Sequence, residues 1–249
     1  MWRALVQAGL ALISSGRCPL CGGESRPADG AVDLAGAAQP RLCRACLDRL
    51  VLPEGGLQGD SPLLWCALAP YGGQLRRLLL TQRHQPDQAV IAALAAELMP
   101  SCASAVHGAL LVPIPSWKRA ANPLPRRLAQ ALAAQPAGGL TVADQVLQRC
   151  RPTVGQHHLD RQLRLRNQRG SFRASPAPAG ISLRQRPIWL VDDILTTGAT
   201  VEAAAQALEE AGLQVDGALC LARTPPPSAT SQRHRPTPSA TATVLPPRL

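Results

Sequence analysis

The chain has 249 residues, a hydrophobic fraction of 46% and a formal net charge of +10. This length is enough for one sizeable core with a small accessory module, and the hydrophobic fraction excludes a chain that is disordered throughout. Lys118 is the only lysine, so nearly all the positive charge comes from arginine, which suits bidentate contacts with phosphate. The charge therefore favours phosphates or nucleic acid as partners without choosing between them, and a generally basic solvated surface is an equal alternative.

The N-terminal segment, residues 1–16, combines a short apolar run with one arginine and small residues. Leu5, Leu12 and Ile13 recur at helical spacing, which predicts an amphipathic helix; a signal peptide is the alternative. We expect no membrane span, because we find no stretch that approaches the roughly 20 apolar residues that a span needs.

Two CxxC pairs follow, with the spacing C-x2-C-x21-C-x2-C, and they comprise Cys18, Cys21, Cys43 and Cys46. Each pair can present two thiolates from one turn, so together they predict the tetrahedral shell of a structural zinc ion. Redox pairs are the alternative, but a thioredoxin-type CxxC opens a helix after a strand, and neither pair does so here. Four scattered cysteines complete the set, and eight thiols in this pattern favour a reducing cytoplasm over a secreted disulfide framework.

From about residue 63 the pattern alternates between strands and helices. Strands are expected over 63–71, 109–115, 186–191 and 214–222, and helices over 86–99, 126–135 and 199–211. This alternation predicts an α/β fold with a parallel sheet and helices on both faces. The predicted organisation is an N-terminal helix and zinc ribbon (1–62), an α/β domain (63–223) and a disordered tail rich in Pro, Ser and Thr (224–249).

The stretch 188–201, IWLVDDILTTGATV, indicates a ligand site. Asp192 and Asp193 follow a buried strand, and ligands bind outside the carboxyl ends of strands in open α/β sheets. The next residues lead into a helix N-terminus, whose amides favour an anion, and they are Thr196, Thr197, Gly198, Ala199 and Thr200. A phosphate cradle beside two carboxylates matches a sugar phosphate. An N-cap with an ordinary strand-end acid, the structural alternative, explains only one Asp or one Thr.

The stretch VDDILTTGAT resembles the phosphoribosyl-pyrophosphate (PRPP) signature of type I phosphoribosyltransferases. The resemblance implies that Asp192 and Asp193 hold the ribose 2′ and 3′ hydroxyls, with Mg²⁺ near by, and that residues 196–200 bind the 5′-phosphate. In that chemistry positive charge builds on the ribose ring as the bond to pyrophosphate loosens. Carboxylates favour the ring charge, and a metal with arginines favours the leaving pyrophosphate.

A cysteine ribbon joined to such a domain resembles the layout of the ComF family, the GntX-like competence proteins, over roughly residues 10–224. Tyr71 with LRRLLL resembles the family's first strand and helix, and LVPIP, with Pro113, resembles its pyrophosphate loop. The pattern of 149–172 and the last strand, 219–224, also match. Two features depart from the family: its RGFNQ-like motif is missing, with Asn122 as the one echo, and TQRHQ (81–85) stands where a lysine is usual. Pyrophosphate contacts and catalysis are therefore left open.

The stretch 149–173 holds seven arginines against one acid: Arg149, Arg151, Arg161, Arg164, Arg166, Arg169 and Arg173. As a loop they would close over the pyrophosphate, and Arg164 is taken as a ligand contact. Tracking a nucleic-acid backbone and forming a solvated basic helix are the alternatives. One Phe, one Tyr and four Trp argue against a large base-stacking platform.

The resemblance thus implies a ComF-like, phosphoribosyltransferase-family protein of the cytoplasm. It would bind PRPP or a related sugar phosphate with Mg²⁺ and act in DNA uptake during natural competence, whether or not it retains glycosyltransferase (pentosyl transfer) activity. The alternative is a non-catalytic competence factor with a relic PRPP pocket, which binds single-stranded DNA and docks a partner such as a helicase through its zinc module. A scaffold without ligands is the third interpretation.

Overall fold

The computed structural model describes residues 16–25, 39–116, 122–136, 138–151, 170–175 and 186–225. The predicted N-terminal helix, the predicted tail, Arg164 and most of the basic stretch lie outside these residues. The division of the chain at residues 62 and 223 stays a prediction.

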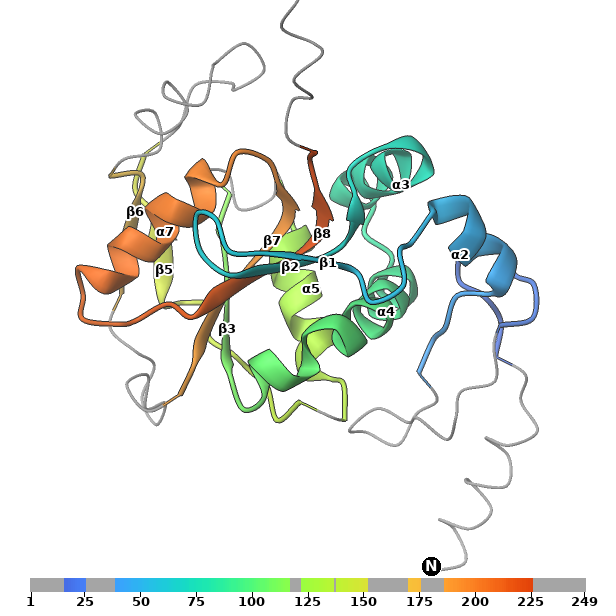
Figure 1. Ribbon diagram of the computed structural model, residues 1–249, viewed down its shortest axis with the longest axis horizontal. Coiled ribbons are helices and arrows are strands. Elements are labelled where there is room, and N and C mark those ends of the chain that lie inside the picture. Colours follow the sequence, from blue (N-terminus) through green and yellow to red (C-terminus); the bar gives the residue numbers. More distant parts are fainter. Residues whose placement is uncertain are drawn as a thin grey trace, which may run out of the picture.

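A six-stranded sheet lies at the centre of the described chain (Figure 1), with the order β1-β2-β8-β7-β3-β4. Its strands are β1 (Leu57–Gly59), β2 (Trp65–Pro70), β3 (Leu110–Pro113), β4 (Thr141–Val142), β7 (Ile188–Leu195) and β8 (Gly217–Arg223). Every neighbouring pair is parallel except β1 with β2. The predicted α/β fold with a mostly parallel sheet is confirmed.

Helices cover both faces of this sheet, also as predicted (Figure 1). The helices α3 (Gly73–His84), α4 (Gln88–Val106) and α5 (Leu124–Ala133) pack into one buried cluster with Trp189 and Val191 of β7. The helix α7 (Ala199–Glu209) packs into a second cluster, with Ile188 and Leu190 of the same strand. Successive side chains of a strand point to opposite faces, so β7 is buried between two helical layers.

One helix of the described chain, α4, is long and apolar enough to cross a membrane by length and composition, which the sequence interpretation did not anticipate. Just over half of that stretch, 56%, is buried inside the protein. Leu94 and Leu98 are fully buried among residues of α3, α5 and the sheet, so α4 is apolar on most sides because it is a core helix.

Several short elements were not predicted. The helix α2 (Arg44–Leu50) spans only two turns, which is too short to show a hydrophobic period. β5 (Leu147–Arg149) and β6 (Phe172–Ala174) form a separate two-stranded antiparallel sheet from distant parts of the sequence. The predicted end of β7 at residue 191 was wrong, since the strand continues to Leu195 by pairing with β8.

Candidate functional site

Asp192 and Asp193 lie near the carboxyl end of β7, between β3 and β8. Asp192 is paired with Cys220 of β8, and the preceding residue, Val191, is paired with Pro113 of β3. The register thus places Pro113 on the neighbouring strand, next to the acids. Asp193 is left out of the β7–β8 register, and its amide donates instead to Asp192 Oδ1 at 2.9 Å. The strand therefore passes through the acids rather than ending on them, with a local break in the ladder at Asp193.

The Asp193 carboxylate is almost fully buried, with 3% of its side chain exposed, and is held by two residues from other elements. Arg83, in the last turn of α3, donates from Nε to Oδ2 at 2.6 Å and from Nη2 to Oδ1 at 3.1 Å. Asn122, just before α5, donates from Nδ2 to Oδ2 at 3.0 Å. Burial by itself would lower the pKa of Arg83, but hydrogen bonding to Asp193 and the charges of both aspartates raise it overall. A buried carboxylate with these partners is electrostatically satisfied.

Asp192 is in a different environment. Burial, followed by the negative charge of Asp193, raises the pKa of Asp192 well above its usual range, although the Asp193 amide and Arg83 oppose the shift. Arg149 of β5 interacts electrostatically with Asp192 from another side. The Arg149 guanidinium stacks 4.8 Å from the centre of the Phe172 ring, and burial lowers its pKa. The carboxyl of Asp192 therefore interacts electrostatically with two arginines, Arg83 of α3 and Arg149 of β5.

The loop after β7 leads directly into α7. Gly198 is its N-cap at φ +85°, a left-handed conformation that glycine adopts without strain. The Thr197 hydroxyl accepts a long hydrogen bond of 3.5 Å from the Ala199 amide. Among the described residues, the amides of Thr196, Thr197 and Gly198 donate to no backbone carbonyl. These donors, at a helix N-terminus beside two acids, suit an anion such as a phosphate.

Arg223, at the end of β8, stabilises this loop by donating hydrogen bonds to its carbonyl groups. Its Nη1 donates to the carbonyls of Leu195 at 3.1 Å, Thr224 at 2.8 Å and Thr196. The guanidinium also lies over the Trp65 ring, 5.4 Å from its centre. Sequence reasoning did not assign Arg223 to the site, and the match of 219–224 to a last strand was its only signal.

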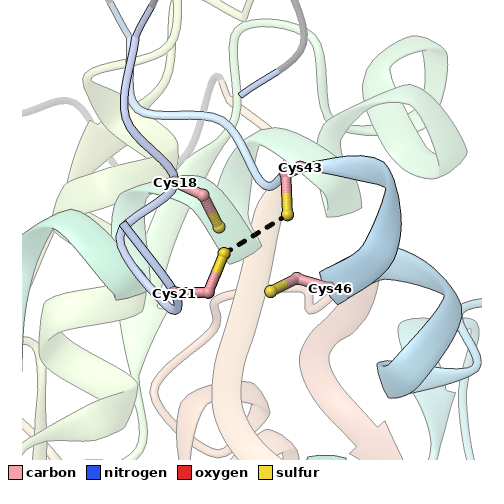
Figure 2. Close-up of side chains that lie close together, drawn as sticks. All are labelled: Cys18, Cys21, Cys43 and Cys46. Atoms are coloured by element: carbon pink, nitrogen blue, oxygen red, sulfur yellow. Dashed lines mark hydrogen bonds between the residues drawn. The ribbon is translucent and has the colours of Figure 1, made fainter. Parts of the chain in front are cut away.

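The four predicted zinc ligands come together, as Figure 2 shows: the sulfurs of Cys18, Cys21, Cys43 and Cys46 point toward one another from two segments. All four Sγ atoms lie within 4.8 Å of one another, and those of Cys21 and Cys43 are 3.5 Å apart. Sulfurs bound at about 2.3 Å around a tetrahedral ion would be about 3.8 Å apart, so this donor set fits zinc.

Local backbone geometry builds this four-cysteine cluster. The turn after Cys18 is closed by hydrogen bonds from the Cys18 amide to Gly23 O and from the Gly22 amide to Cys18 O, both 2.8 Å, with Gly22 at φ +74°. Cys43 is the N-cap of α2 and Cys46 lies in its first turn. Burial alone would raise the pKa of the Cys18 thiol, but backbone hydrogen bonds from Cys43, Leu20 and Cys21 lower it to about 6. Burial and the other three thiols raise the pKa of Cys46, so within the cluster Cys18 is the thiol that loses its proton most readily.

The fold and these two sites define the class of the protein: a mostly parallel α/β protein with an acidic strand end beside a threonine-glycine loop, and a four-cysteine cluster.

No family model matches the chain. The chain is similar over 80 residues to the DNA utilization protein YhgH, with 39% identity to the proteins of Salmonella typhi and Salmonella typhimurium and 36% to that of Escherichia coli O157:H7. The match covers 32% of this chain and a third of the length of those relatives. These matches confirm, as a distant one, the resemblance that the sequence motifs indicated.

Two solved structures show weak likeness to the fold. A hypoxanthine phosphoribosyltransferase from Staphylococcus aureus matches with a TM-score of 0.33 and 16% identity, over 55% of this chain and 65% of that one. The protein TT1426 from Thermus thermophilus matches with a TM-score of 0.26 and 17% identity, over 57% and 85% of the two chains.

Proposed function

We propose that this chain binds a phosphorylated pentose, PRPP or a related sugar phosphate, where β7 meets α7. One observation carries the proposal: the two acids of β7 stand next to the Thr196–Thr200 loop, whose first amides have no backbone acceptor in the described chain. The loop would bind the 5′-phosphate, and the carboxyl of Asp192 would accept hydrogen bonds from ribose hydroxyls. Arg149 supplies positive charge near by, as a diphosphate requires.

Mg²⁺ prefers carboxylate, carbonyl and water oxygens, and it usually keeps a substrate phosphate in its shell. Asp192, a residue that is only partly buried, fits such an ion better than Asp193, whose two oxygens already accept three hydrogen bonds. When bound, Mg²⁺ would neutralise the diphosphate and favour its departure.

Thermal unfolding with PRPP and Mg²⁺ tests the binding proposal. A ligand at 100 times its Kd stabilises the folded state by about 2.7 kcal/mol, so Tm should rise by several degrees. The double variant Asp192→Asn/Asp193→Asn should lose this rise, whereas the Asp60→Asn control, at an exposed site, should keep it. An unchanged Tm in the wild type at millimolar PRPP would contradict the proposal.

Catalysis is the next question, because binding alone fits both an active phosphoribosyltransferase and a non-catalytic descendant. A transferase releases pyrophosphate when a suitable acceptor is present. We therefore propose to screen nucleobases and other amines for acceptor-dependent pyrophosphate release from PRPP. Release that disappears in Asp192→Asn supports the transferase, and binding without release by any acceptor supports the non-catalytic form.

A role in DNA handling is the second candidate, and it includes uptake during competence, a helicase partner and a cytoplasmic location. The similarity to the YhgH proteins, whose name refers to DNA utilization, favours it, as does the arginine-rich stretch 149–173. A gel shift with single-stranded DNA should weaken in Arg164→Ala/Arg166→Ala/Arg169→Ala, with a shallower salt dependence, because each lost phosphate contact lowers the slope by about 0.7. The control triple variant Arg44→Ala/Arg49→Ala/Arg77→Ala removes exposed arginines elsewhere. Equal loss in both variants would point to net charge alone.

A further inference from the structure

The two adjacent aspartates differ in the hydrogen bonds that their carboxylates already accept. Both oxygens of Asp193 accept hydrogen bonds, from Arg83 Nε and Nη2 and from Asn122 Nδ2. Within the described residues, the carboxyl of Asp192 accepts one hydrogen bond, from the Asp193 amide to Oδ1. A sugar hydroxyl or a cation would have to displace a buried ion pair to reach Asp193, but not to reach Asp192.

Arg83 has N–H groups that its pairing with Asp193 does not use. Its side chain is 31% exposed, and bidentate pairing with Asp193 uses two of the five N–H groups of the guanidinium. The other three have no hydrogen-bond acceptor among the residues that the structure describes. Pairing through two parallel bonds also fixes the plane of the guanidinium, which a single bond would not do.

Asn122 adds a second anchor. Its amide nitrogen binds Asp193, and its Oδ1 accepts a hydrogen bond from the Leu124 amide at the start of α5, at 3.2 Å. The Asp193 carboxylate thereby joins the end of α3 to the beginning of α5 at the carboxyl end of β7. The position of Arg83 is thus determined by three elements rather than by its own flexible side chain.

We infer that the two aspartates have separate tasks: Asp192 contacts the sugar, whereas Asp193 is a positioning residue that presents Arg83 to the diphosphate of the ligand. The inference rests on the proposed function and refines the expectation that both acids hold ribose hydroxyls. It also names a candidate residue, Arg83, for the pyrophosphate contacts that the sequence left open.

Isothermal titration with three probes separates these tasks: ribose 5-phosphate, inorganic pyrophosphate and PRPP, each with Mg²⁺. Arg83→Gln and Asp193→Asn should each weaken pyrophosphate and PRPP about tenfold or more, with ribose 5-phosphate unchanged. Asp192→Asn should lose affinity for ribose 5-phosphate. In a titration without Mg²⁺, where no ion links Asp192 to the diphosphate, it should retain its affinity for pyrophosphate. Because Asp193 acts through Arg83, the double variant Arg83→Gln/Asp193→Asn should bind no more weakly than Arg83→Gln alone.

Asp193→Asn leaves Arg83 without its carboxylate, and this change could reduce binding by unfolding the protein. A second variant distinguishes unfolding from a loss of the contact. Arg83→Lys keeps the charge beside Asp193 but not the bidentate geometry, so it should fold normally and still lose pyrophosphate affinity. If Asp193→Asn weakens ribose 5-phosphate as much as PRPP, or if the two changes add, the inference is overturned. Binding of none of the three probes by the wild type would instead contradict the proposed function itself.

Discussion

At the scale of single residues, the two adjacent aspartates differ: the charge of Asp193 is paired, whereas Asp192 has no ion pair within the described part of the chain. Asp193 has a guanidinium and an amide as partners, whereas Asp192 is held beside it with a raised pKa because of burial and the Asp193 charge. The ligand-free protein therefore carries an acid whose ionised form is unfavourable. A bound cation or hydroxyl donors would relieve that cost, which is a common arrangement in ligand sites.

The pH dependence of stability tests this description of Asp192. Its pKa in the folded state lies above the ordinary value of 3.8, so at low pH both states are protonated and the folded state loses nothing. As pH rises toward the folded-state pKa, the unfolded chain releases its proton first, and stability falls by about 1.4 kcal/mol per unit of pKa difference. Asp192→Asn should thus unfold at higher urea than the wild type above about pH 5, with the gain vanishing below about pH 4. Asp60→Asn, at an exposed site, serves as the control, and a gain that is constant across pH would refute the assignment.

At the scale of elements, the β7–α7 loop is supported from outside its own segment. Arg223 of β8 binds the carbonyls of Leu195 and Thr196, and Pro62, between β1 and β2, packs on Gly198. A Cβ at Gly198 would lie 2.5 Å from Pro62 Cδ. The loop conformation therefore depends on both the positive φ of Gly198 and the absence of a side chain there.

A glycine pair separates these two requirements. Gly198→Ala adds a clash with Pro62 to the strain of a left-handed backbone, so it should lower the free energy of unfolding by about 2 kcal/mol or more. Gly55→Ala has a similar φ of +74° but meets no atom within 4 Å, so it should cost about 1 kcal/mol. Urea titrations of both variants check the difference. Equal costs would show that Pro62 moves aside freely.

At the scale of the whole molecule, the four-cysteine cluster shares a core with the helices. Cys18, Cys43 and Cys46 belong to the same buried cluster as Leu79 of α3 and Met99 of α4. Arg41 adds a long ion pair of 3.9 Å to Glu97 of α4. A metal would order a segment that has little apolar core of its own. Loss of the metal should therefore destabilise α3 and α4 as well.

Zinc removal tests this coupling. The purified protein should contain one zinc ion per chain, and chelation or Cys46→Ser should lower Tm by about 5 °C or more. Cys150→Ser, at an exposed thiol, is the matched control and should change neither zinc content nor Tm. Zinc content is measured by atomic emission and Tm by circular dichroism. A protein that is free of zinc and indifferent to chelator would contradict a structural metal.

The sequence was most informative where a function depends on neighbouring residues. Most of the central strands and helices were expected close to their observed places, because they are apolar runs of distinct length and composition, whereas α3 was indicated only by the family resemblance. Short elements such as α2 and β5 were missed, since three to seven residues are too few for a period and their stability comes from packing. The end of β7 was placed too early because acids normally end a buried strand, and here distant partners neutralise one of them.

The amino-acid sequence by itself determined the local parts of this protein: the acidic strand end with its threonine-glycine loop, and the two cysteine pairs. These parts need only adjacent residues, so spacing and residue type reveal them. Only the tertiary structure decided what surrounds them. Arg83 lies 110 positions and Asn122 71 positions from Asp193, and their pairing follows from how α3 and α5 pack on the sheet. Long-range ion pairs depend on packing rather than on local pattern, which is why the different environments of Asp192 and Asp193 became visible only in the folded chain.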